Sequence, residues 1–224
     1  MSVGGRGADT RYDWPYFDLR CRRCERLATF LDEVGKRHPD YHARPVPPFG
    51  ARDARLLVVG LAPGMHGANA TGRPFTGDFA GILLYRTLYA TGFASAPASR
   101  HADDGLQLFG CRITNAVKCL PPQNKPVGAE INACNEYLAD EIASLAPGAV
   151  ILALGGIAHR AVVRAHGLRQ KDFVFGHGRE HVLPGTKTML DSYHCSRYNT
   201  QTRRLTDAMF AAVFARAREL LGDD

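Results

Sequence analysis

The chain has 224 residues, of which 45% are hydrophobic and 22% charged, a composition typical of a globular protein with one substantial core. No apolar run approaches the roughly 20 residues of a membrane span, and the polar N-terminus has no signal-peptide core, so we predict a cytoplasmic protein that does not enter a membrane. The net charge of +6 permits an anionic partner such as nucleic acid but does not identify one.

Strand-like and helix-like segments alternate along the chain. Residues 1–10 are polar and glycine-rich and are expected to be disordered, whereas residues 11–224 are expected to form one domain. Helices are expected over 27–34, from near residue 78, over 129–145, after residue 156 and over 203–221; strands are expected over 55–60, 112–117, 149–154 and 187–193, with an edge strand near 181–183. In the helix that follows residue 78, the positions expected to pack are Leu83, Tyr85, Leu88 and Tyr89. This alternation predicts an α/β fold, a three-layer α/β/α sandwich around a central, mostly parallel four-stranded sheet.

A glycine-rich stretch, residues 60–81, follows the first predicted strand. Ligands bind where parallel strands end, and glycine lets the backbone approach a ligand closely. Phe75 and Asp78 are set into this stretch. Its glycine spacing does not match the dinucleotide fingerprint, and a partial P-loop pattern at residues 67–74 lacks the lysine and the following Ser or Thr. A nucleotide-binding loop and a purely structural loop therefore remain as weaker alternatives.

Four of the six cysteines form two pairs. Cys21 and Cys24 are separated by two residues, and Cys119 and Cys134 by 14. In a cytoplasmic protein such cysteines indicate metal or thiol chemistry rather than disulfides. Four thiolates suit a tetrahedral zinc or an iron–sulfur cluster, and the spacing alone leaves both metals open.

Polar side chains follow the predicted strands. If the four main strands are parallel, the loops after them meet at one edge of the sheet. That edge would gather Phe75, Asp78, Asn115, Asn124, His194, Ser196 and Asn199, with Arg197, Tyr198, Arg203 and Arg204 around them. Two of these residues have simpler interpretations, since Asp78 can be a helix N-cap and His194 a hydrogen-bonded structural histidine.

Several spaced motifs together resemble those of the uracil-DNA glycosylase superfamily. They are Gly-Leu-Ala-Pro-Gly at 60–64, Gly-Arg-Pro-Phe-Thr-Gly-Asp at 72–78, the two cysteine pairs, Pro-Pro-Gln-Asn-Lys-Pro at 121–126 and His194-x-Ser196-x2-Asn199. The chain is most similar to the iron–sulfur type B branch, also called family five. This resemblance implies a monomeric base-excision repair enzyme that hydrolyses the N-glycosidic bond of uracil, hypoxanthine or xanthine in double- or single-stranded DNA. It also implies a structural [4Fe-4S] cluster on the four paired cysteines.

The resemblance implies a role for each site residue. Phe75 would stack on a base flipped out of the duplex, and Asn115 would contact the polar edge of that base. The backbone at Gly60, Ala62 and Gly64 would approach the base and sugar. Asn124 would be a polar catalytic residue beside Asp78 and His194. His194 would donate a hydrogen bond to the departing base anion. The residues expected to contact DNA are Ser196, Arg197, Tyr198, Asn199 and Arg203.

One departure from the family pattern bears on the mechanism. Uracil-strict relatives carry an acid in the first motif, near the positions that Leu61 and Ala62 occupy here. Asp78 is then the nearest carboxylate able to orient water. Two alternatives stay open, a uracil-strict glycosylase of the family-four kind and a metal-stabilised nucleic-acid-binding module without catalysis.

Overall fold

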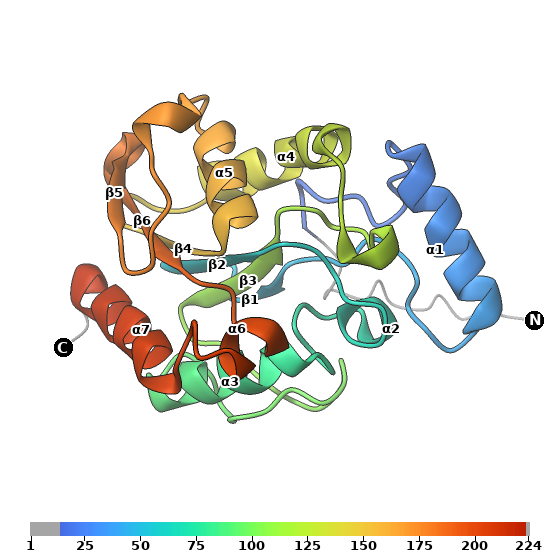
Figure 1. Cartoon of the computed structure of the whole chain (residues 1–224), viewed down its shortest axis with the longest axis horizontal. Helices are drawn as coiled ribbons and strands as arrows, with labels where there is room; N and C mark the ends of the chain where they lie inside the picture. Colours follow the sequence, from blue (N-terminus) through green and yellow to red (C-terminus); the bar gives the residue numbers. More distant parts are fainter. Residues whose placement is uncertain (1–13, 223–224) are drawn as a thin grey trace, which may run out of the picture.

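A computed structural model describes residues 14–222 of the chain (Figure 1). The predicted disorder of residues 1–10 concerns a segment outside this range. The strands are β1 (Phe49–Gly50), β2 (Leu56–Gly60), β3 (Cys111–Asn115), β4 (Val150–Leu154), β5 (Glu180–Leu183) and β6 (Lys187–Ser192). The α-helices are α1 (Glu25–Arg37), α2 (Ala68–Thr71), α3 (Phe79–Ala90), α4 (Gly128–Ala143), α5 (Gly156–Ala165), α6 (Arg197–Gln201) and α7 (Asp207–Leu221). Short 3-10 turns are η2 (Pro122–Asn124), η3 (Gln170–Asp172) and η4 (Pro184–Thr186).

The strands form one six-stranded sheet in the order β1-β3-β2-β4-β6-β5. The four inner strands are parallel, as predicted, and each was expected within a residue or two of its observed position. The prediction of a four-stranded sheet is wrong in its count, because antiparallel strands β1 and β5 extend the two edges. Strand β5 corresponds to the expected edge strand. Strand β1 was not expected, since it has two residues and follows a proline-rich connection.

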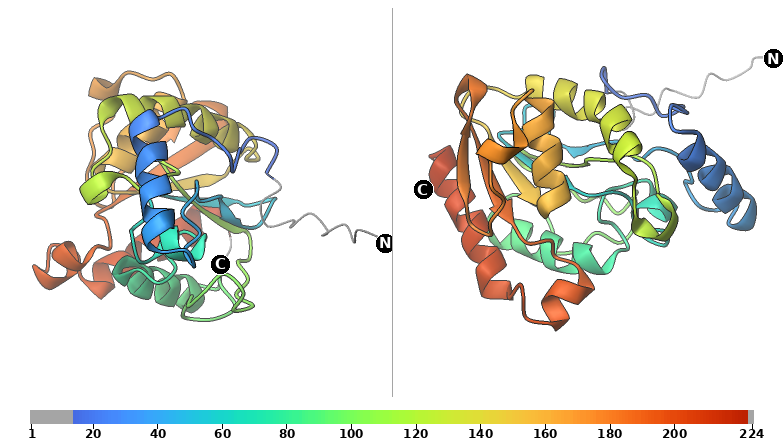
Figure 2. Two further views of the ribbon diagram at one scale, coloured as in Figure 1. Left: turned by 90° about the vertical axis from the view of Figure 1, so that its right-hand side faces the viewer. Right: turned by 45° about the horizontal axis from the view of Figure 1, so that its top comes forward.

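Two apolar faces of the sheet account for the three layers. Strand β2 is buried at every position, and its side chains alternate between the faces. Leu56 and Val58 pack with residues of α3 and α7, whereas Leu57 and Val59 pack with residues of α4 and α5. Figures 1 and 2 show these helix pairs on opposite sides of the sheet. The α/β/α sandwich is therefore confirmed.

Helix α3 begins directly after Asp78, as expected. Its residues Leu83, Tyr85 and Leu88 are buried, but Tyr89 is 50% exposed, so its predicted packing is wrong. None of the helices within residues 14–222 is long and apolar enough to cross a membrane. The loops after β2, β3, β4 and β6 lie at one edge of the sheet because these strands run parallel, and this edge carries the candidate site.

Candidate active site

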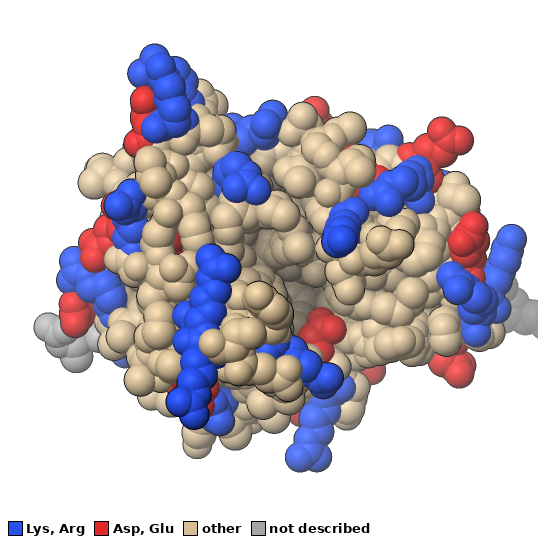
Figure 3. Space-filling view, viewed as in Figure 1, with Lys and Arg blue, Asp and Glu red and all other residues tan. Residues whose placement is uncertain are grey.

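A cavity of about 470 Å³ lies at the carboxyl edge of the parallel strands. Its walls are Leu61, Ala62, Gly64, Phe75, Asp78, Phe79, Ala80, Asn115, Asn124, His194, Ser196 and Arg197. Figure 3 shows this face of the molecule, hollowed near its centre and with Lys and Arg side chains on several sides. The structure thus brings together most of the site residues that the sequence predicts, from three segments far apart in the chain, 61–80, 115–124 and 194–197.

The ring of Phe75 forms one wall of the cavity, and two glycines make room for it. A Cβ atom at Gly60 would lie 2.4 Å from Oδ1 of Asn115 and 2.6 Å from Cζ of Phe75. A Cβ atom at Gly81, in the first turn of α3, would lie 1.8 Å from the Phe75 carbonyl oxygen. Phe75 itself has the left-handed φ of 57°, a conformation that persists only where the surroundings enforce it. The loop therefore fixes the aromatic ring.

Asn115 is the last residue of β3 and lies opposite Gly60 in the parallel register. Its side chain is 3% exposed and faces the cavity. Within residues 14–222 the side-chain amide of Asn115 has no hydrogen-bond partner, so its N–H donors and its oxygen acceptor are available to a ligand. Asn124 lies across the cavity on η2, is exposed and has a φ of 56°.

Asp78 contacts the cavity from the N-terminus of α3. It occupies the N-cap position, but its side chain makes no capping bond to α3, so that part of the simpler interpretation is wrong. Its Oδ2 instead accepts a hydrogen bond from the Ala68 amide, 3.2 Å away at the start of α2. A Cβ atom would lie 2.5 Å from Oδ1 at Gly64 and 1.9 Å from it at Gly67. The carboxylate is thus packed against bare backbone.

Burial raises the pKa of the Asp78 carboxyl above its usual range, and the Ala68 amide opposes this shift only in part. A carboxylate that is poorly solvated and has one donor keeps most of its lone pairs for another ligand, such as a water molecule. Its environment therefore suits a group that orients or activates water.

His194 lies beside Phe75 in the cavity wall, and the two rings are stacked with centroids 5.9 Å apart. Burial lowers the pKa of His194 to about 4. The imidazole is therefore neutral at pH 7, and its one N–H can donate to a developing anion. The Asn199 side chain donates to the His194 carbonyl over 2.8 Å, and Ser196 caps α6 by accepting from the Asn199 amide. These two residues hold the histidine loop in shape.

The predicted DNA-contacting residues separate into two groups. Ser196 and Arg197 line the cavity, and the Arg197 guanidinium lies 4.9 Å from the centroid of the Phe79 ring. Tyr198 and Arg203 lie outside the cavity walls and are exposed, Tyr198 by 70%. Asn199 and Arg204 line a smaller neighbouring cavity that shares His194 and Leu61 with the main one.

The four paired cysteines surround one small enclosed space between the start of α1, the loop after β3 and α4. Among the described residues, no three of these cysteines have sulfur atoms that all lie within 4.8 Å of one another. A single zinc ion would hold its sulfurs about 4 Å apart, given Zn–S bonds of about 2.3 Å. Burial, and to a smaller extent the neighbouring cysteines, raise the pKa of the Cys119 thiol. A positively charged metal centre would reverse that effect.

Some residues at the site were not singled out from the sequence. Gly67 and Gly81 belong to the glycine-rich stretch, but their partners were unknown until the loop was seen folded. Phe79 lines the cavity as the first residue of α3. The sequence analysis also does not predict the buried cluster of His159, His181 and Asp191, although an aspartate at a buried position of strand β6 indicates a polar partner.

The cavity combines an aromatic platform, free amide groups, a neutral imidazole and a poorly solvated carboxylate. Such a set can hold a flat polar heterocycle, stabilise negative charge that develops on it and position water beside it.

Comparison with known proteins agrees with this chemistry. Residues 47–218 match the model of the uracil DNA glycosylase superfamily. The chain is 47% identical over 207 residues to the type-5 uracil-DNA glycosylase of Thermus thermophilus, which covers 90% of this chain and 94% of that protein. Two relatives come from Pyrobaculum aerophilum: its type-5 enzyme is 40% identical over 203 residues, covering 89% of this chain and 88% of the relative, and its type-4 enzyme is 38% identical over 130 residues, covering 58% of each chain. The protein belongs to the uracil-DNA glycosylase superfamily.

Proposed function

We propose that this protein is a DNA glycosylase that hydrolyses the N-glycosidic bond of uracil and of the deaminated purines hypoxanthine and xanthine. The observation that carries the proposal is the cavity in which the Asp78 carboxylate and the neutral His194 imidazole accompany the Phe75 ring. The relatives that match this chain over most of its length are named type-5 uracil-DNA glycosylases.

The reaction requires the base to leave the duplex, because its glycosidic bond is unreachable while it is stacked. The flipped base would stack on Phe75, and the Asn115 amide would bond to its polar edge. As the bond breaks, negative charge develops on the base and positive charge on the sugar. His194 would donate an N–H to the base anion, and Asp78 would orient the water that attacks the sugar and stabilise the positive charge there.

The breadth of the substrate range follows from the other walls. Leu61 and Ala62 are apolar and carry no group that selects one pattern of donors and acceptors. The polar walls Asn115 and Asn124 are amides, each of which can donate and accept. Such a lining supports acceptance of several deaminated bases, since specificity arises where a buried polar group is left without its partner.

Excision from a panel of duplexes tests this proposal. Each duplex would carry uracil, hypoxanthine or xanthine at one position, with an undamaged duplex as control. We expect cleavage of all three lesions, and loss of cleavage in Asp78→Ala and His194→Ala with DNA affinity retained. Binding of lesion duplexes without cleavage by the wild-type protein would support the non-catalytic module instead. Cleavage of uracil alone would support a uracil-strict enzyme.

We propose further that Cys21, Cys24, Cys119 and Cys134 hold a structural [4Fe-4S] cluster. Their common enclosed space and the resemblance to the iron–sulfur type B branch support this assignment. Anaerobically purified protein should be brown and contain about four iron atoms per chain, and Cys134→Ala should lose both colour and iron. A colourless protein with one equivalent of zinc would refute the cluster.

The cellular setting belongs to the same proposal. All six cysteines lack disulfides, which supports a reducing compartment such as the cytoplasm. The walls of the cavity already include every group that the proposed reaction uses, which supports action as a monomer on DNA. Sedimentation of the protein with and without a lesion duplex would measure the stoichiometry.

A further inference from the structure

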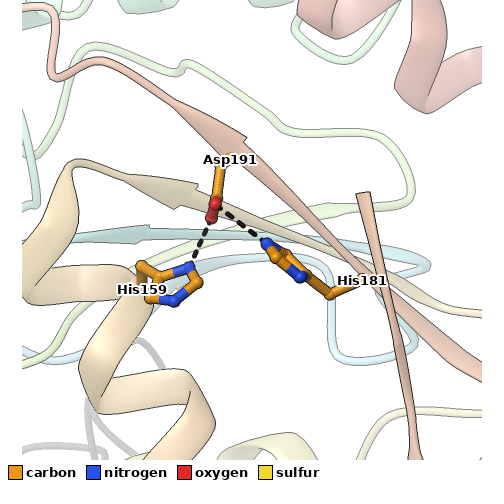
Figure 4. Close-up of side chains that lie close together, drawn as sticks. All are labelled: His159, His181 and Asp191. Carbon is orange, nitrogen blue, oxygen red and sulfur yellow. Dashed lines mark hydrogen bonds and ion pairs between the residues drawn. The ribbon is translucent and has the colours of Figure 1, made fainter. Parts of the chain in front are cut away.

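Three buried side chains from three elements lie close together. They are His159 of α5, His181 of β5 and Asp191 of β6, and Figure 4 shows both imidazole rings directed at the carboxylate. Nδ1 of His159 lies 2.8 Å from Oδ1 of Asp191, and Nε2 of His181 lies 3.1 Å from Oδ2. The three side chains are at most 8% exposed.

Each polar atom of this cluster that faces another group has a hydrogen-bond partner, beginning with His159. Nε2 of His159 lies 2.9 Å from the Phe173 carbonyl oxygen, which can only accept, so this nitrogen donates. Nδ1 faces the Asp191 carboxylate, which also accepts. Both ring nitrogens of His159 therefore face acceptors, and these contacts tie α5 to Asp191 of β6 and to the Phe173 carbonyl. Both histidines bond directly to the carboxylate, one to each of its oxygens.

The cluster holds the segment 173–179 against the sheet. Asp191 Oδ2 also accepts from the Gly176 amide over 3.2 Å. The backbone of Asp191 accepts from the Gly178 amide and donates to the Arg179 carbonyl. Together with the bond from His159 to Phe173, these contacts fix the segment at both of its ends.

The segment 173–179 contacts Tyr193, the residue that precedes His194. The Tyr193 ring contacts Phe175, with centroids 6.1 Å apart, and stacks on His177 at 5.1 Å. The Tyr193 amide donates to Nδ1 of His177 over 3.1 Å. Phe175, Tyr193 and His194 line the same cavity of about 260 Å³. A continuous set of contacts thus joins the buried cluster to the backbone of His194.

We propose that His159, His181 and Asp191 form a positioning unit that sets the His194 imidazole, acting through the segment 173–179 and Tyr193. The inference rests on the proposed function of His194 as hydrogen-bond donor to the departing base. Unlike the residues of the cavity, these three side chains touch neither substrate nor reacting atoms.

The test compares His159→Leu, His181→Leu and His181→Gln with Val162→Ala. Gln retains an N–H donor toward Asp191, whereas Leu does not. Val162 is a fully buried apolar residue on the same helix as His159, so its truncation loosens α5 but removes no hydrogen-bonding group of the cluster. The readouts are the single-turnover rate of uracil excision, the DNA dissociation constant, the melting temperature and the ring ¹⁵N resonances of His194.

We expect the two Leu variants to excise uracil about tenfold or more slowly, since small misplacements of a reacting group are costly, with unchanged DNA affinity and shifted His194 resonances. His181→Gln should recover most of the rate, and Val162→Ala should lower only the melting temperature. If His159→Leu does not fold, the two His181 variants carry the comparison. Full activity with unshifted His194 resonances in folded Leu variants would overturn the proposal, as would stoichiometric zinc that His181→Leu abolishes. An inactive wild-type protein would refute the proposed function instead.

Discussion

The position of Asp78 depends on the absence of a side chain at Gly67, so Gly67→Ala perturbs the carboxylate without replacing it. A Cβ atom at Gly67 would lie 1.9 Å from Oδ1 and 2.0 Å from Cγ of Asp78. Ordinary van der Waals contact begins near 3.4 Å, so the carboxyl group must move by about 1.5 Å, the difference between 3.4 and 1.9. A misplacement of about 1 Å can cost a hundredfold in rate. We therefore expect Gly67→Ala to excise uracil about a hundredfold more slowly.

The assay is single-turnover excision from a uracil duplex with enzyme in excess, accompanied by the DNA dissociation constant and a thermal melt. Gly128→Ala is the matched control, because a Cβ atom there meets nothing within 4 Å and should leave the rate unchanged. The double variant Gly67→Ala/Asp78→Ala should be no slower than Asp78→Ala alone, since both changes remove the same carboxylate from the same place.

Two results would refute this reasoning. A folded Gly67→Ala protein that cleaves at the wild-type rate would show that excision does not need the carboxylate where it lies. A double variant much slower than Asp78→Ala would show that Gly67 contributes through something other than Asp78.

Three further predictions concern other parts of the site. Burial lowers the pKa of His194 to about 4, so as the pH falls below about 6.5 the unfolded chain binds a proton first and the free energy of unfolding falls, by at most about 3 kcal/mol near pH 4. Urea denaturation at several pH values should show a smaller fall for His194→Gln than for the wild-type protein. Equal falls in the two proteins would contradict the assignment. Gly60→Ala would place a Cβ atom 2.4 Å from Oδ1 of Asn115 and 2.6 Å from Cζ of Phe75. The affinity of this variant for a lesion duplex should therefore drop about tenfold or more, while its affinity for undamaged DNA is retained. Fluorescence anisotropy would measure both affinities. Arg197→Ala should reduce the slope of log affinity against log salt by about one, because one phosphate contact is lost; an unchanged slope would place Arg197 away from the DNA backbone.

The sequence was sufficient to predict the inner sheet and the edge that carries the site. Apolar runs define β2 and β4, whereas β3 and β6 have a mixed composition. Parallel strands bring the loops after them together whatever the detailed shapes of the loops. The sequence did not predict strand β1, because two residues carry no periodic pattern. Nor did it predict where Asp78 would find its partner, because the bond to Ala68 joins two segments of one irregular loop. Contacts of this kind depend on the folded path of the backbone and not on local propensity.

The enclosure of Asp78 by backbone separates two properties of the site. Its carboxylate accepts from the Ala68 amide and packs against the backbone at Gly64 and Gly67, so main-chain atoms set its place. The walls proposed to face a base include Leu61, Ala62 and Asn124. Substitutions in those walls can change which base is accepted while the group proposed to handle water stays fixed. A library built to alter base choice should therefore vary the walls and keep both glycines.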